Sequence, residues 1–320
     1  MTETAGDAKT VSSAVSGSTG VNGTWLIVAA AFQWAMLGPM ARVAFAEGVP
    51  SLTVAFWRAT LAALLFAAHS AFTRAPALHR TDRPRAILLG VLGMALLYVA
   101  YFNSVQHGGA ALAAILLYSA PIWVAVGAHT LLGERVSRTE VGALSLTLIG
   151  VVLVALSSGD ASGESSGSSS GVSYLALMWG VLSGLSYAGY FLLGRPLFAR
   201  NTPSRVLTWV LIVTALVLLP FAEWQFFSLK AWGALAFLAA IGTFGAYLCN
   251  ATGLRTVPTA RAATIATLEP VLAVGAAYLV WGETLAPLGL FGGALVVLGV
   301  VLSARGSRGG ANVRERDVRE

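Results

Sequence analysis

One stretch of this chain recurs 149 residues downstream without a gap, and its residues are almost entirely apolar. The offset relates residues 93–153 to residues 242–302. The matched positions include Tyr98 with Tyr247, Pro121 with Pro270, Gly133-Glu134 with Gly282-Glu283, and Gly150–Leu153 with Gly299–Leu302. Duplicated apolar halves are typical of membrane transporters, in which the binding site lies where the halves meet.

The composition requires a lipid environment. Hydrophobic residues make up 57% of the chain, charged residues only 11%, and the mean hydropathy is +0.76. Soluble domains carry roughly 25% charged residues, so a water-soluble core of this size is excluded. The net charge of +6 does not indicate nucleic acid, because the basic residues lie in short loops between apolar segments. The single cysteine, Cys249, excludes an internal disulfide and a cysteine metal cluster.

We predict an all-α integral membrane protein with ten transmembrane helices. A helix needs about 20 apolar residues to cross the hydrocarbon. The apolar segments that qualify are 24–42, 52–72, 85–105, 110–132, 139–157, 173–194, 205–222, 231–252, 260–281 and 286–304. Five make a first repeat over 24–157 and five a second over 173–304, joined by a flexible Ser/Gly-rich periplasmic linker at 158–172.

The polar ends and the charges set the expected orientation. Residues 1–23 lack the apolar core of a signal peptide, and we expect them and the basic residues 305–320 to be disordered cytoplasmic tails. With the N-terminus inside, 17 Lys and Arg residues fall on the inner side, while only Arg42 and Lys230 fall outside. Five helices per half, an odd number, place the second half upside down relative to the first, so we predict inverted repeats.

Several motifs resemble one family. The fourth predicted span contains Tyr-Ser-Ala-Pro121 and is followed by Gly-Glu134; its counterpart contains Leu-Glu269-Pro270 and is followed by Gly-Glu283-Thr-Leu. These motifs, with Phe-Trp-Arg58, resemble the EamA-type members of the drug/metabolite transporter superfamily. The resemblance implies ten spans, two five-helix repeats and cytoplasmic termini. The second half is most similar to amino-acid exporters of that family, although members with other cargo share these motifs.

Glu269 is the first candidate for substrate binding. It lies nine residues into its predicted span, which is about 13 Å deep and near the middle of the membrane. A carboxylate there, beside the carbonyl that Pro270 leaves unpaired, suits an ammonium group or a proton, which would give proton coupling. The alternative is a structural role in which Glu269 satisfies a neighbouring polar group and holds the bend. The equivalent residue in the first half is Ala120.

Arg58 is the other charge within a predicted span. Charged groups in the hydrocarbon are costly and indicate a function. Arg58 suits a substrate carboxylate. Equally, its side chain can reach the outer headgroups or pair with Glu47 or another carboxylate.

Amide and aromatic side chains form a second group of candidates. Polar-tipped rings suit a pocket for a small amphipathic metabolite, whereas each ring alone is also consistent with ordinary packing. The candidates are Gln33, Trp34, Tyr98, Tyr101, Trp179, Tyr187, Tyr247 and Asn250.

The remaining motifs have structural interpretations. Pro121 and Pro270 are expected hinges or static kinks. Glu134 and Glu283 are expected to cap a neighbouring helix or to pair with loop arginines. Glycines in the fifth spans suit close packing within the chain or a homodimer. The histidines lack ligand spacing and no phosphate-binding loop appears, so we expect no metal, no cofactor and no ATP.

Together these features predict a secondary transporter rather than an enzyme. Its expected role is the export of amino acids or related small metabolites across a bacterial inner membrane by alternating access. Efflux of drugs or other toxic compounds is the alternative within this class. A membrane-embedded enzyme or a non-transporting scaffold is the alternative from another class.

Overall fold

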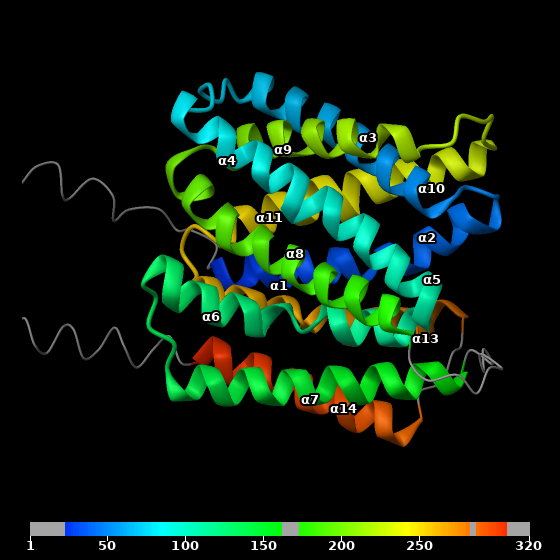
Figure 1. The fold of residues 1–320 in the computed structure, drawn as a ribbon, viewed down its shortest axis with the longest axis vertical. Helices are drawn as coiled ribbons and strands as arrows, with labels where there is room; N and C mark the ends of the chain where they lie inside the picture. The colour runs from blue at the N-terminus through cyan, green and yellow to red at the C-terminus, as the bar shows by residue number, and fades with distance from the viewer. Residues whose placement is uncertain (1–22, 162–172, 282–285, 306–320) are drawn as a thin grey trace, which may run out of the picture.

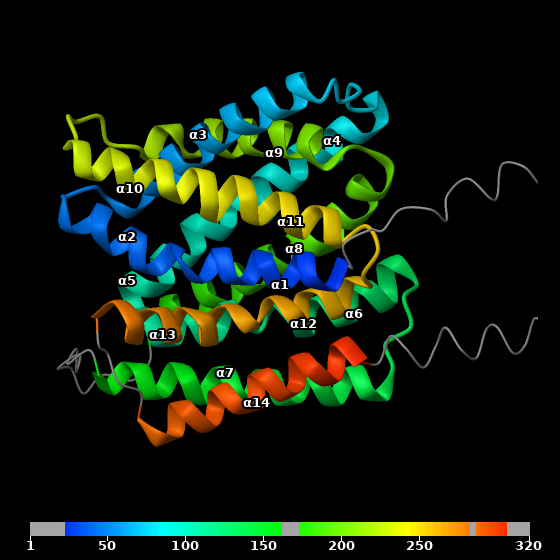
Figure 2. The same ribbon diagram turned by 180° about the vertical axis from the view of Figure 1, so that it is seen from behind.

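The computed structural model describes residues 23–161, 173–281 and 286–305. The predicted tails lie outside these residues except at 23 and 305, and Glu283, which is expected to cap a helix, lies outside them. The predicted linker lies outside them except at 158–161, which belong to a helix. Within the described ranges the chain is helical and contains no strand. The helices form a layered bundle in which most run along one common direction (Figures 1 and 2).

The helices before the linker are α1 (Gly23–Ala35), α2 (Leu37–Ala46), α3 (Ser51–Phe72), α4 (Arg83–Leu88), the π-helical segment η2 (Leu89–Ala95), α5 (Leu96–Leu117), α6 (Ala120–Leu132) and α7 (Arg138–Ala161). The predicted spans 52–72 and 139–157 match α3 and α7 closely, whereas 24–42 is divided into α1 and α2, and α5 runs across the predicted boundary between 85–105 and 110–132. Short 3₁₀ turns, η1 (Arg80–Asp82) and η3 (Leu219–Phe221), lie beside α4 and α9.

The helices after the linker follow the same succession. They are α8 (Tyr174–Arg200), α9 (Pro203–Leu218), α10 (Leu229–Ala239), the π-helical segment η4 (Ala240–Gly245), α11 (Ala246–Gly253), α12 (Thr259–Ala266), α13 (Leu268–Trp281) and α14 (Pro287–Arg305). The segments η2 and η4 fall at nearly matching places in the 149-residue offset, so the similarity extends to an unusual backbone feature.

Eight helical stretches in the described part of the chain are long and apolar enough to cross a membrane, where the sequence predicted ten. One of the eight, Arg80–Leu132, has 53 residues and contains two predicted spans. Gly109 interrupts it with φ 80° and ψ 164°, a conformation that favours glycine. The predicted span 260–281, which is divided into α12 and α13, is not among the eight.

Corresponding helices of the two halves pack against each other. Helix α7 lies beside α14, and α3 beside α9, and in both views the members of each pair run in opposite directions (Figures 1 and 2). Glycines bring α7 and α14 together: a Cβ on Gly150 would lie 2.5 Å from the Gly292 carbonyl oxygen. These glycines therefore serve packing within the chain.

Each half contains one helix that is broken at the same repeat position. Helix α5 ends at Leu117 and α6 begins at Ala120, while α12 ends at Ala266 and α13 begins at Leu268. Pro121 and Pro270 lie in the first turns of the helices that follow, where their missing N–H costs no hydrogen bond. The matched prolines thus coincide with matched breaks in the backbone.

Candidate functional site

A group of buried rings lies where the two halves meet. Tyr98 (α5), Tyr118 (after α5), Tyr187 and Tyr190 (α8) and Tyr247 (α11), all at most 9% exposed, are called the tyrosine cluster here. The ring centroids of Tyr190 and Tyr247 are 5.3 Å apart. Trp34 of α1 contacts the cluster edge-on, 5.3 Å from Tyr247 and 6.5 Å from Tyr187. The cluster therefore draws rings from both halves.

Arg58 contacts this group from α3. Its Nε donates to Thr243 Oγ1 over 3.1 Å, and its guanidinium carbon lies 5.0 Å from the centre of the Tyr98 ring. Glu47 is not its partner: that carboxylate pairs with Lys230 Nζ at 2.9 Å and accepts from Ser228 Oγ at 2.7 Å. The alternative of an Arg58–Glu47 ion pair is therefore wrong, and Arg58 is held beside the cluster.

Glu269 lies in the first turn of α13, directly after the break in the second half. It is half-buried, and the Tyr118 hydroxyl is close enough to interact with its carboxyl group. Tyr101, Tyr187 and Arg58 are close enough for electrostatic interaction with it. The two charges that the sequence places within spans, Arg58 and Glu269, thus come close to the same group of tyrosines.

Two buried polar groups in this region have no partner. Asn250 Oδ1 accepts a hydrogen bond of 3.1 Å from the Tyr190 hydroxyl, but Asn250 Nδ2 has no acceptor. The Tyr98 hydroxyl is also buried without a partner. An unsatisfied buried polar group costs about 1–3 kcal/mol. Such groups are suited to a polar ligand that would supply the missing hydrogen bonds.

Other predicted residues are placed less centrally. Gln33 donates from Nε2 to the Ala29 carbonyl at 3.1 Å and to Cys249 Sγ at 3.7 Å. Trp179 is half-buried two turns before Tyr187 on α8, and among the described residues it makes no hydrogen bond or ring contact with the cluster. The sequence reasoning missed Tyr118, although its position three residues before Pro121 matches that of Thr267 before Pro270.

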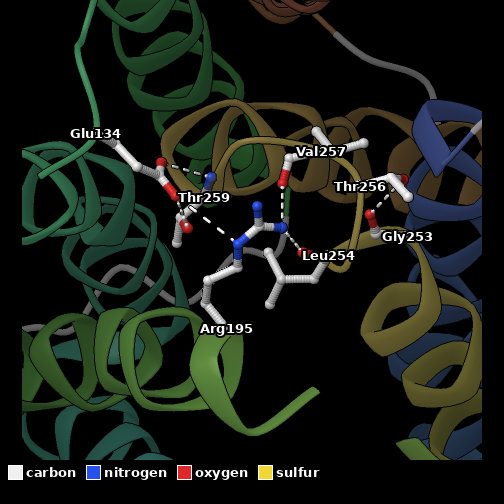
Figure 3. A network of polar contacts seen from close by, with 7 residues as sticks. All are labelled: Glu134, Arg195, Gly253, Leu254, Thr256, Val257 and Thr259. Carbon is white, nitrogen blue, oxygen red and sulfur yellow. Dashed lines mark hydrogen bonds and ion pairs between the residues drawn. The ribbon is translucent and has the colours of Figure 1, made fainter. Parts of the chain in front are cut away.

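A second polar group lies at one end of the bundle (Figure 3). Glu134 follows α6 and accepts from the Thr259 backbone N–H at 2.8 Å and from Thr259 Oγ1 at 2.6 Å. It therefore caps α12, as the sequence predicted, although its cationic neighbour is Arg195 of α8, at 3.9 Å, rather than a loop arginine. Arg195 also donates to the carbonyls of Leu254 and Val257.

A further ion pair, which Figure 3 does not draw, belongs to the same polar group. Arg261 of α12 donates from Nη2 to Glu140 Oε1 of α7 over 2.8 Å, and both side chains are only about a tenth exposed. Ser137 and Glu140 also cap the start of α7 through reciprocal hydrogen bonds. We call Glu134, Glu140, Arg195, Thr259 and Arg261 the end cluster.

The apolar helices and the polar groups buried among them define a multi-pass membrane protein built as a transporter. The chain belongs to the EamA-like transporter family, whose model matches residues 21–156 and again residues 174–305. The named relatives are consistent with this assignment.

Three relatives are informative. An uncharacterized transporter of Archaeoglobus fulgidus is 31% identical over 65% of this chain and 72% of its own length. The pseudopaline exporter CntI of Pseudomonas aeruginosa is 28% identical over 70% and 75%. A probable terminal-alkyne amino-acid exporter of Streptantibioticus cattleyicolor is 27% identical over 61% and 62%.

One solved crystal structure has the same fold. It superposes with a TM-score of 0.77 and covers 89% of this chain and 97% of its own chain. The identity is 18%, so this likeness concerns the fold alone.

Proposed function

We propose that this protein is a secondary transporter that exports amino acids or related small metabolites across a bacterial inner membrane. The observation that carries the proposal is the meeting of Arg58, Glu269 and the tyrosine cluster at the junction of the halves. An α-amino acid carries a carboxylate and an ammonium group, and these two charges are complementary to a guanidinium and a carboxylate. Two of the relatives are named as exporters, one of them of an amino acid.

The proposed architecture has ten crossings in two inverted repeats of five, at residues 24–157 and 173–304. Its support is the double family match, the opposite directions of α3 and α9 and of α7 and α14, and the matched helix breaks. In this assignment the break at Gly109 separates two spans, while α12 and α13 form one broken span. The excess of arginine on the predicted inner side supports cytoplasmic termini.

Broken helices suit alternating access. Their free ends present unpaired backbone groups to a ligand near the middle of the membrane, while the backbone groups of the flanking helices keep their hydrogen bonds. Glu269 begins such a segment, and it is the residue we expect to exchange a proton or a substrate ammonium group. Pro121 and Pro270 would fix the places at which the two broken helices bend. We assign the protein no catalytic role and no cofactor.

Transport by purified protein in lipid vesicles tests this proposal. Vesicles loaded with a panel of labelled amino acids, and separately with cationic dyes, are assayed with and without a pH gradient. We expect saturable amino-acid transport that Glu269→Gln reduces at least tenfold, since a charge-assisted hydrogen bond contributes about 1.5–3 kcal/mol. Glu223→Gln, an exposed carboxylate in the α9–α10 connection, is the matched control. Transport of dyes alone would indicate drug efflux instead.

A further inference from the structure

The two ends of the bundle contain different polar contacts between helices. The α6–α7 and α11–α12 connections lie at one end and the α2–α3 connection at the other (Figures 1 and 2). The first end contains the end cluster, in which the nearly buried Arg261–Glu140 pair joins the second half to the first. The opposite end contains the Glu47–Lys230 pair, whose lysine side chain is 67% exposed. Exposed ion pairs contribute little to stability, whereas removing one partner of a nearly buried pair is strongly destabilising.

The end cluster fastens helix α12 and the loop before it to α6, α7 and α8. Glu134 receives the N–H and the hydroxyl of Thr259, so the end of α6 is fastened to the start of α12. Arg195 holds the loop before α12 through two of its carbonyl oxygens (Figure 3). Arg261 fastens the same helix to Glu140 of α7. Helix α12 cannot move away from α6 and α7 without breaking the contacts of Thr259 with Glu134 and of Arg261 with Glu140.

The repeat does not reproduce the end cluster at the opposite end. Within the range in which the 149-residue offset holds, Thr259 corresponds to Ala110 and Arg261 to Leu112. Glu140 corresponds to Gly289. Alanine lacks the hydroxyl that donates to Glu134, and a leucine and a glycine cannot form the ion pair. Glu134 itself recurs as Glu283, which lies outside the described residues. The duplicated architecture therefore carries an asymmetric set of contacts between its halves.

We propose that the end cluster is a gate that keeps this end closed in the resting transporter and makes the state open at the opposite end the favoured one. This inference rests on the proposed function, because a gate implies a transported substrate. By the arginine distribution, the closed end is the cytoplasmic one. Substrate entry from the cytoplasm then requires α12 to separate from α6 and α7, and the contacts re-form once the substrate has left.

A distance measurement tests the gate without any substrate. Spin labels at Thr139→Cys and Arg255→Cys, both exposed positions flanking the end cluster on opposite halves, are introduced into the Cys249→Ala protein in lipid. Double electron–electron resonance then gives the distance distribution between α7 and the α11–α12 loop. We expect a single short population in the parent protein and a second, longer population in Arg261→Leu and in Thr259→Ala, which copy the residues of the opposite end.

The controls separate the gate from general damage and from the proposed function. Lys230→Gln removes the ion pair at the opposite end and should leave the distribution at this end unchanged. Unchanged distributions in both Arg261→Leu and Thr259→Ala would overturn the gate, as would equal lengthening in Lys230→Gln. Because no substrate is used, the gate can be supported or overturned even if amino-acid transport is not observed.

Discussion

The two broken helices are interrupted at the same repeat position, but only the second carries a charged side chain there. In the first half the break lies between Leu117 and Ala120, and in the second between Ala266 and Leu268. A proline follows in each half at the same repeat position. The first break presents Ala120, which is 1% exposed, where the second presents the half-buried carboxylate of Glu269.

This difference separates the backbone break, which both halves have, from the charge, which only the second half has. The break arises from sequence that both halves retain, so the backbone arrangement is common to them. The charge is present in one half only, and it lies close to a tyrosine from the other half, Tyr118. Function in such a duplicated protein is therefore expected where the halves differ, on a framework that they share.

The largest expected effect comes from making the two breaks alike. Ala120→Glu would place a second carboxylate in a fully buried position without an identified cation. Because an uncompensated buried charge costs about 3–5 kcal/mol, the variant should unfold at a clearly lower temperature. Thermal unfolding of the purified protein measures this, with Ala120→Ser as the control of similar size. Equal stability of the glutamate and serine variants would mean that the first break tolerates a charge.

Removing the contact between the two breaks should have the next largest effect. Tyr118→Phe keeps the ring but loses the hydroxyl that faces Glu269. We expect a rise in the KM for substrate of roughly tenfold or more, because hydrogen bonds to charged groups contribute about 1.5–3 kcal/mol. Tyr278→Phe, an exposed tyrosine on α13, is the matched control. In the Glu269→Gln background the same change should have almost no further effect.

Replacing the prolines tests the framework rather than the charge. Pro121→Ala and Pro270→Ala should each lower the free energy of unfolding by about 1 kcal/mol or less, since proline mainly restricts the unfolded chain at a compatible position. Both should slow transport with little change in KM, and to a similar extent. Loss of transport in one variant only would indicate that the breaks have different mechanical roles.

The smallest expected effect concerns the exposed pair at the opposite end from the end cluster. Hydrogen bonds from Ser228 and Lys230 lower the pKa of Glu47 below its ordinary value. A lowered carboxyl pKa stabilises the fold above the unfolded-state value of about 4.3, and this contribution is lost as the pH falls through the lower folded value. Thermal unfolding of wild type and Glu47→Gln should therefore differ slightly at pH 6 and converge as the pH falls through the lowered folded value. A difference that persists in acid would contradict this origin.

The sequence predicted the framework better than the contacts. The repeat and the apolar runs predicted helices whose bounds lie within a few residues of those observed for most spans. Glu134 was correctly expected to cap a helix, because a Gly-Glu at a helix end implies a nearby N-terminus. The sequence did not predict which residues these side chains contact. Glu140 and Arg261 are 121 residues apart in the chain, and Arg58 contacts the uncharged hydroxyl of Thr243. Such pairs depend on which helices the fold brings together.

The count of spans shows a second limit. A hydropathy pattern treats α12 and α13 as one apolar run, because a break of one residue leaves the composition unchanged. The prolines indicated a bend, but the pattern does not distinguish a bent helix from two helices. The break nevertheless decides which backbone groups are free for a ligand near Glu269.

Binding of a labelled amino acid to the purified protein tests the central claim most directly. The dissociation constant is measured for wild type, Glu269→Gln and the exposed control Glu223→Gln, using the substrate that the transport panel selects. The account predicts that Glu269→Gln binds at least tenfold more weakly while its unfolding temperature stays close to wild type and Glu223→Gln is unaffected. Equal affinity of Glu269→Gln and wild type would show that the carboxylate at the second break does not bind the substrate.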